Sequence, residues 1–109
     1  MQISARRIDK TTVFDVTGDI DLANSPEVRK ALLKELKELK TPRVVMNLSK
    51  VRYIDSSGVA SLVEGLKASR DSGSRFILYG LSPSAREVLQ LSRLLKIFEV
   101  YEDEESALK

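Results

Sequence analysis

The sequence has 109 residues, a length that fits one domain with one hydrophobic core. It contains no cysteine and no histidine, so disulfides, thiolate metal sites and Ser-His-Asp catalytic sites are excluded. The net charge of +2 comes from 18 basic and 16 acidic residues that are interleaved, and without a basic cluster we expect no nucleic-acid binding. No signal peptide and no apolar run of ~18 residues is present, so we expect a cytoplasmic protein without membrane insertion.

The first part of the chain predicts a hairpin followed by a helix. Residues 2–8 and 11–17 read as two strands joined by a short turn, because the second segment is rich in β-branched residues. Asn24-Ser25-Pro26 indicates a helix start in which the serine caps free amides and the proline fits the first turn. An apolar stripe at helical spacing supports this helix, which ends at Thr41-Pro42.

The rest of the chain alternates strands and helices. Strands are expected at residues 43–48, 76–79 and 97–101, and helices at 59–69, from Ser82 onward and from Glu102 onward. The order ββαβαβαβα predicts an α/β fold. We expect a mixed four- to five-stranded sheet flanked by about four helices.

A run of four residues, Asp55-Ser56-Ser57-Gly58, stands where a strand-like segment meets the helix of residues 59–69. The free amides and partial positive charge of a helix N-terminus favour a negative group, so a phosphate on Ser56 would be tolerated there. Helix capping by Asp55 or by a serine explains the same run without a functional role. The motifs of a hydrolase nucleophile elbow and of a phosphate-binding loop are both absent.

Several short motifs follow one another along the chain. They are Thr17-Gly18-Asp19-Ile20-Asp21, Val45-Met46-Asn47-Leu48, Tyr53-Ile54-Asp55-Ser56-Ser57-Gly58, Leu81-Ser82-Pro83 and Leu91-Ser92-Arg93-Leu94-Leu95-Lys96-Ile97-Phe98. Each motif is weak by itself, but their order at this chain length is specific. Together they resemble the STAS domain, and in particular the bacterial anti-sigma factor antagonists. The resemblance covers residues 1–109 and implies a single STAS domain.

The resemblance implies a regulatory protein and not an enzyme. Members of this kind bind an anti-sigma factor that is also a serine kinase, and so release a sigma factor. The kinase phosphorylates the first serine of the run, which corresponds to Ser56, and this ends the complex until a PP2C-type phosphatase reverses it. The implied partner-binding residues are Asp21, Asp55, Ser56, Ser57 and Gly58. No catalytic residue, cofactor or metal is implied, because the kinase supplies ATP and magnesium.

One departure from the family pattern keeps a second function open. Partner-switching members often continue the run as Ser-Gly-Leu-Gly, whereas residues 57–62 here read Ser-Gly-Val-Ala-Ser-Leu. This variant also resembles the cytoplasmic STAS subunits of lipid-transporting ABC permeases, where the same helix would dock on the permease or its ATPase. Nucleotide binding, suggested for some members of the family, is a third alternative, but no phosphate loop supports it.

Overall fold

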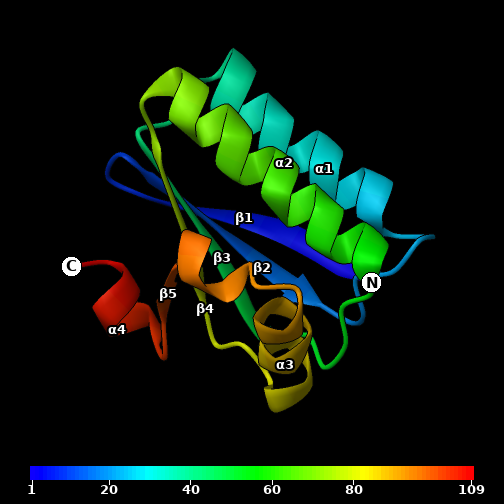
Figure 1. The fold of residues 1–109 in the computed structure, drawn as a ribbon. Helices are drawn as coiled ribbons and strands as arrows, with labels where there is room; N and C mark the ends of the chain where they lie inside the picture. The colour runs from blue at the N-terminus through cyan, green and yellow to red at the C-terminus, as the bar shows by residue number, and fades with distance from the viewer.

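Five strands form one mixed sheet, and helices pack on both of its faces (Figure 1). The computed structural model describes all residues from 1 to 109. The strands are β1 (Gln2–Ile8), β2 (Thr11–Thr17), β3 (Arg43–Lys50), β4 (Arg75–Tyr79) and β5 (Glu99–Tyr101). The α-helices are α1 (Ser25–Leu33), α2 (Ser56–Ser72), α3 (Pro83–Leu91) and α4 (Glu104–Ala107). A π-helical turn (Lys34–Glu38) continues α1, and a 3₁₀ turn (Leu95–Ile97) precedes β5.

The strands lie in the order β1-β2-β3-β4-β5, so each strand pairs with its neighbour in sequence. β1 and β2 form an antiparallel hairpin, and Asp9 takes the positive φ of 54° that suits its tight turn. β2 to β5 run parallel, and each parallel connection crosses over through a helix. The prediction of an α/β fold with a mixed sheet is therefore confirmed.

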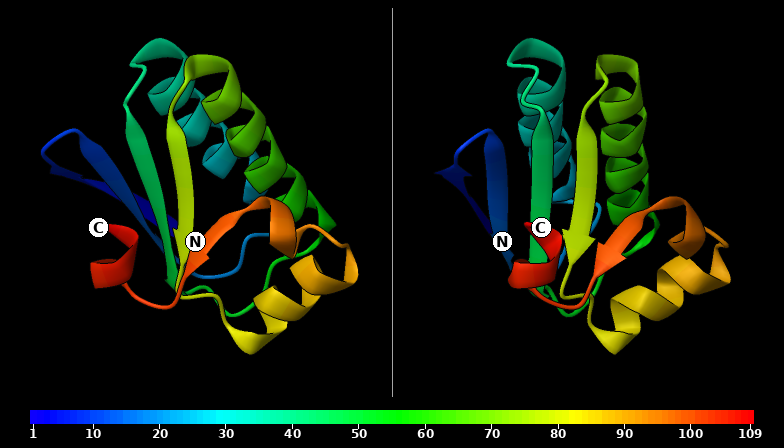
Figure 2. Two further views of the ribbon diagram at one scale, coloured as in Figure 1. Left: turned by 60° about the vertical axis from the view of Figure 1, so that its left-hand side comes forward. Right: turned by 90° about the vertical axis from the view of Figure 1, so that its left-hand side faces the viewer.

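The two faces of the sheet are covered unequally (Figure 2). α1 and α2 lie side by side on one face, where alternate strand residues such as Phe14, Met46 and Leu78 belong to the main core. On the opposite face, Ala107 of α4 packs against a smaller cluster that includes Val45. Because β2 and β3 are adjacent and parallel, the N-terminal ends of α1 and α2 meet at the same edge of the sheet.

The last strand is shorter than the sequence predicts. We expected it over residues 97–101, but β5 begins at Glu99, where pairing with Ile77 of β4 starts. Phe98 turns into the core instead and packs edge-on against Phe76, with the ring centroids 6.4 Å apart. The available strand partner, rather than the apolar pattern, therefore decides where this strand begins.

A buried carboxylate ties the end of α1 to the β1–β2 hairpin. Glu35, in the π-helical turn, is only 3% exposed. It accepts hydrogen bonds from the guanidinium of Arg7 and from Thr12 Oγ1, the latter at 2.5 Å. Burial by itself raises the pKa of Glu35, but these donors outweigh burial and hold the pKa below its usual value. The charged form of Glu35 therefore stabilises the fold.

We expect Glu35→Gln to lower the free energy of unfolding at neutral pH by about 1–3 kcal/mol, because its donors lose a charged acceptor. Since folding depresses the pKa, the stabilisation by Glu35 is present above the ordinary carboxylate range and is lost as the pH falls through the folded-state pKa. Urea unfolding at about pH 7 and about pH 3 measures this, and the difference between wild type and variant should shrink at the lower pH. A difference of equal size at both pH values would contradict it.

Candidate functional site

Two loops meet at the edge of the sheet where the parallel strands end, beside the start of α2. One loop follows β2 and contains Ile20, and the other follows β3 and leads to Asp55. Ile20 and Ile54 form an isolated parallel bridge, and both residues are fully buried. The amide of Ile20 donates to Tyr53 O at 3.1 Å, and the amide of Asp55 donates to Ile20 O at 3.2 Å. The two loops are therefore one hydrogen-bonded unit.

Asp55 joins this unit to α2 through both of its carboxylate oxygens. Its Oδ1 accepts a hydrogen bond from Gly58 N at 3.0 Å, which caps the helix. Its Oδ2 accepts a hydrogen bond from Leu22 N in the other loop, also at 3.0 Å. The capping role that the sequence suggested for this position is thus confirmed for Asp55. One side chain sets the first turn of α2 against the loop that follows β2.

Gly58 allows α2 to begin in contact with that loop. A Cβ at this position would lie 2.4 Å from the carbonyl oxygen of Ile20 and 2.6 Å from Ile54 Cγ2. A backbone oxygen cannot turn aside as the end of a flexible side chain can, so a larger residue requires a shift of the loop. The requirement for glycine is steric, because the φ of Gly58 is not positive.

Asp21 forms the turn that leads into α1. Its Oδ1 accepts hydrogen bonds from the amides of Ala23 and Asn24, each at 3.1 Å, and its carbonyl oxygen accepts one from Ser25 N at 2.7 Å. The prediction that Ser25 caps this helix is wrong, because Asn24 occupies the N-cap position and no side chain caps from there. The turn built on Asp21 binds the amides of residues 23 to 25, and the carbonyl oxygen of Asn24 accepts from the amides of Glu27 and Val28.

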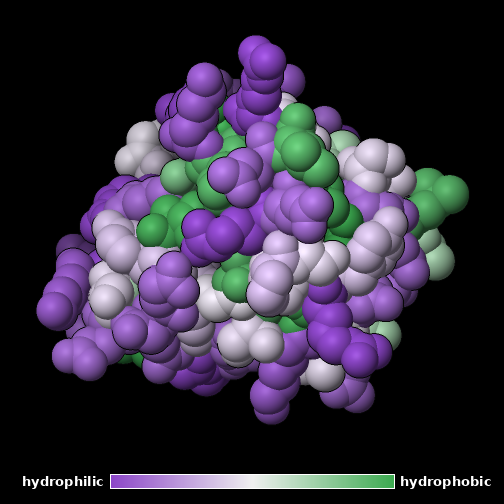
Figure 3. All heavy atoms as spheres, turned by 60° about the horizontal axis from the view of Figure 1, so that its bottom comes forward, coloured by the Kyte–Doolittle hydropathy of each residue, from purple (hydrophilic) through white to green (hydrophobic).

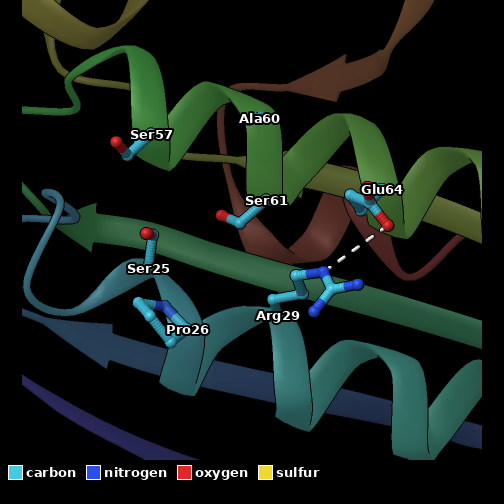
Figure 4. A pocket seen from close by; sticks show the side chains of 7 residues that line it. All are labelled: Ser25, Pro26, Arg29, Ser57, Ala60, Ser61 and Glu64. Carbon is cyan, nitrogen blue, oxygen red and sulfur yellow. Dashed lines mark ion pairs between the residues drawn. The ribbon is translucent and has the colours of Figure 1, made fainter.

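The two serines of the run face different surroundings. Ser56 is the first residue of α2, it is exposed, and its hydroxyl makes no hydrogen bond within the chain. Ser57 is half-buried and lines a groove between α1 and α2 with a volume of about 330 Å³ (Figure 4). The hydrogen bond from Leu22 to Asp55 holds the loop of Asp21 against the start of α2. The structure thus brings the five predicted site residues together around one helix start.

Two exposed hydrophobic side chains flank this site, and neither was predicted from the sequence. Leu22 is 75% exposed and Tyr53 is 48% exposed, and they come from the two loops that Asp55 connects. The surface at this end of the molecule is largely hydrophilic, with small hydrophobic areas between polar groups (Figure 3). The sequence signal for Leu22 was an apolar residue in a loop, outside any helical or strand period. Tyr53 belonged to the motif that ends in the serine run, but no role was predicted for it.

The arrangement presents the Ser56 hydroxyl for modification at a helix end that favours negative charge. The first turn of α2 stabilises negative charge, and the Ser56 hydroxyl is presented to solvent at that turn.

No group of three acidic side chains is placed so that it could hold a metal ion. None of the helices is long and apolar enough to cross a membrane.

Comparison with known proteins assigns the chain to a family. The family model described as the STAS domain matches residues 2–107. This chain belongs to the STAS domain family. The STAS domain described above is 32% identical over 101 residues to an anti-sigma-B factor antagonist of Listeria monocytogenes, a match that covers 92% of this chain and 86% of the relative. It is 23% identical over 108 residues to an anti-sigma F factor antagonist of Paenibacillus polymyxa, covering 99% and 92% of the two chains.

Solved structures share the fold of this STAS domain. An anti-sigma factor antagonist from Mycobacterium paratuberculosis superposes with a TM-score of 0.87 at 24% identity, covering 98% of this chain and 90% of the other. The Bacillus cell fate determinant SpoIIAA, solved in its phosphorylated form, superposes with a TM-score of 0.75 at 22% identity, covering 96% of each chain. At these identities the similarity establishes a common fold.

We expect Gly58→Ala to destabilise this STAS domain by about 2–4 kcal/mol, because the new Cβ overlaps the carbonyl oxygen of Ile20. Alanine is intrinsically the better helix former by about 1 kcal/mol, so a loss of stability has to come from the clash. Urea unfolding measures the change, with Lys67→Ala at an exposed position of α2 as the control. A Gly58→Ala variant as stable as wild type would contradict the close approach.

We expect Asp55→Ala to lower the free energy of unfolding by about 1–3 kcal/mol, because two amides lose their acceptor at once. Hydrogen exchange should become faster at the amides of Leu22 and Gly58 in particular. Asp71→Ala, at the exposed far end of α2, is the matched control. If exchange at Leu22 stayed as slow as in wild type, the link between the two loops would not depend on Asp55.

Proposed function

We propose that this STAS domain is an anti-sigma factor antagonist that acts by partner switching. In its unphosphorylated form it binds an anti-sigma factor serine kinase and so frees a sigma factor. Phosphorylation of Ser56 by that kinase breaks the complex, and a PP2C-type phosphatase restores the binding form. The domain acts in the cytoplasm as a ligand and substrate of its partners, and it is not itself an enzyme.

The observation that carries this proposal is the position of Ser56. A kinase needs an accessible hydroxyl, and Ser56 is exposed at the first residue of α2 with no hydrogen bond to break. The phosphate then needs a place where negative charge does not unfold the domain, and a helix N-terminus provides one. Support comes from the relatives that are named anti-sigma factor antagonists, and from SpoIIAA, which has a phosphorylated form.

The residues of the proposed binding face divide into two groups. Asp55 and Gly58 shape the face, because one fixes the two loops and the other permits their contact with α2. Asp21, Ser56 and Ser57 offer polar groups to the partner, and the exposed side chains of Leu22 and Tyr53 add hydrophobic contact.

Phosphorylation of Ser56 would weaken this interface through charge and desolvation. It adds about −1.5 to −2 charges at a surface that already carries the carboxylates of Asp21 and Asp55. The partner would have to strip water from this phosphate or make room for it. Each ~1.4 kcal/mol of binding free energy lost in this way lowers the affinity tenfold.

We expect Ser56→Ala to bind the anti-sigma factor kinase as tightly as the unphosphorylated wild type. The Ser56 hydroxyl makes no hydrogen bond within the chain, so its removal leaves the binding face unchanged. Ser56→Glu should bind about tenfold more weakly or worse, since it places a charge where the phosphate would be. Isothermal titration calorimetry with the kinase encoded nearest to this gene measures both. Gln90→Glu, which adds the same charge at an exposed position of α3, is the control and should bind normally.

The same experiment separates this proposal from docking on an ABC permease or its ATPase. Docking predicts a stable complex with the permease subunit and equal binding by wild type, Ser56→Ala and Ser56→Glu. Mass spectrometry after incubation with kinase and ATP adds a direct test. An active kinase that leaves Ser56 unmodified would contradict the partner switch.

A further inference from the structure

The groove beside Ser56 has a lining that the proposed switch does not use. It lies between the N-terminal halves of α1 and α2, and its volume of about 330 Å³ is about ten times the ~30 Å³ that a water molecule occupies in the liquid. Figure 4 shows the hydroxyls of Ser25 and Ser57 at one end and Arg29 with Glu64 at the other. The groove therefore has room for a polar group of several atoms.

Ser25 is the residue that points to a ligand. It is only 9% exposed, yet its hydroxyl makes no hydrogen bond within the chain. In Figure 4 its oxygen is directed from α1 towards α2, into the groove. The hydroxyl of Ser61, which also lines the groove, already donates to Gly58 O at 2.7 Å. No buried side-chain oxygen or nitrogen of the chain lacks a hydrogen-bond partner, so the Ser25 oxygen is open to the groove. Its hydroxyl is therefore free to donate to a group that enters there.

Arg29 supplies a positive charge that is only loosely held. Its Nε lies 3.5 Å from Glu64 Oε2, and the two side chains are 56% and 44% exposed. An exposed ion pair is worth at most ~1 kcal/mol, so Arg29 can turn to a stronger partner without a large loss. Its terminal nitrogens make no other ion pair or hydrogen bond within the chain. An anion in the groove would therefore gain both a hydroxyl donor and a guanidinium.

We propose that Ser57 is a second phosphorylation site and that Ser25 and Arg29 hold its phosphate in the groove. The modifying enzyme is an ATP-dependent serine kinase of the class named above, so the occurrence of the modification rests on the proposed function, whereas the fit of the groove does not. The bond between Ser57 Oγ and the γ-phosphorus of ATP forms while the bond from that phosphorus to the ADP oxygen breaks. The hydroxyl proton passes to a base of the kinase.

The two phosphates would differ in the donors within their reach. Each carries about −1.5 to −2 charges and three acceptor oxygens beside the positive end of α2. The carboxylate of Asp55, at the same end of α2, repels a phosphate on Ser57. Whether the phosphate stays in the groove therefore depends on the donors Ser25 and Arg29. Ser56 does not line the groove, and its phosphate projects towards the partner. Phosphorylation of Ser57 instead joins α1 to α2.

Phosphoserine incorporated by genetic encoding at position 57 or at position 56 tests the groove without a kinase. Donors and cations favour the dianion, so the second pKa of the phosphate, followed by phosphorus NMR, should be lower at position 57 than at position 56 by about 0.5 or more. Arg29→Gln and Ser25→Ala should each raise the value at position 57 and leave that at position 56 unchanged. Equal values at both positions, or no response to either substitution, would overturn the proposal.

Mapping of phosphates after treatment with the cognate kinase and ATP shows whether the modification occurs. We expect Ser56→Ala to retain a phosphate on Ser57, and Ser57→Ala to retain one on Ser56. Phosphate on Ser56 alone would overturn the second site and support the switch. Phosphate on Ser57 alone would support the second site and contradict the switch, and phosphate on neither serine would contradict both.

Discussion

The carboxylate of Asp55 is the interaction on which the whole site depends. It accepts one amide from the first turn of α2 and another from Leu22, which lies 33 residues earlier in the chain. Gly58 makes this possible, because any Cβ there would meet the carbonyl of Ile20. A helix start, two loops and two exposed hydrophobic side chains are thereby held in one arrangement before any partner binds. Preorganisation of this kind reduces the ordering that binding would otherwise require.

Helical geometry gives the adjacent serines different environments. At 3.6 residues per turn, neighbouring side chains point about 100° apart around the axis. Ser56 consequently faces solvent, while Ser57 faces α1 across the groove. One hydroxyl is open to solvent, and the other lines a groove that Ser25 and Arg29 also line. The phosphates proposed on the two serines would therefore meet different surroundings.

The helix starts that the sequence predicted correctly depend on hydrogen bonds that close within a few residues. Asp55 caps α2 as expected, and α3 begins directly after Ser82, where the sequence predicted a helix start. The prediction that Ser25 caps α1 failed, because the helix begins at Ser25 itself and Asn24 stands at the N-cap position. The amides of Glu27 and Val28, which a capping serine would bind, donate to the carbonyl oxygen of Asn24 instead. The start of the last strand, expected at residue 97, was wrong because pairing with β4 sets it.

The sequence by itself determined the α/β class, the order of the elements, the serine run at a helix start and the resemblance to the STAS domain. These depend on periodicity, capping residues and motif order, all of which are written along the chain. Only the tertiary structure decided that Gly58 is required by Ile20, that Leu22 and Tyr53 border the site, and that the Ser25 hydroxyl faces an open groove. Each of these is a contact between segments far apart in sequence, and no local pattern encodes the distance between them.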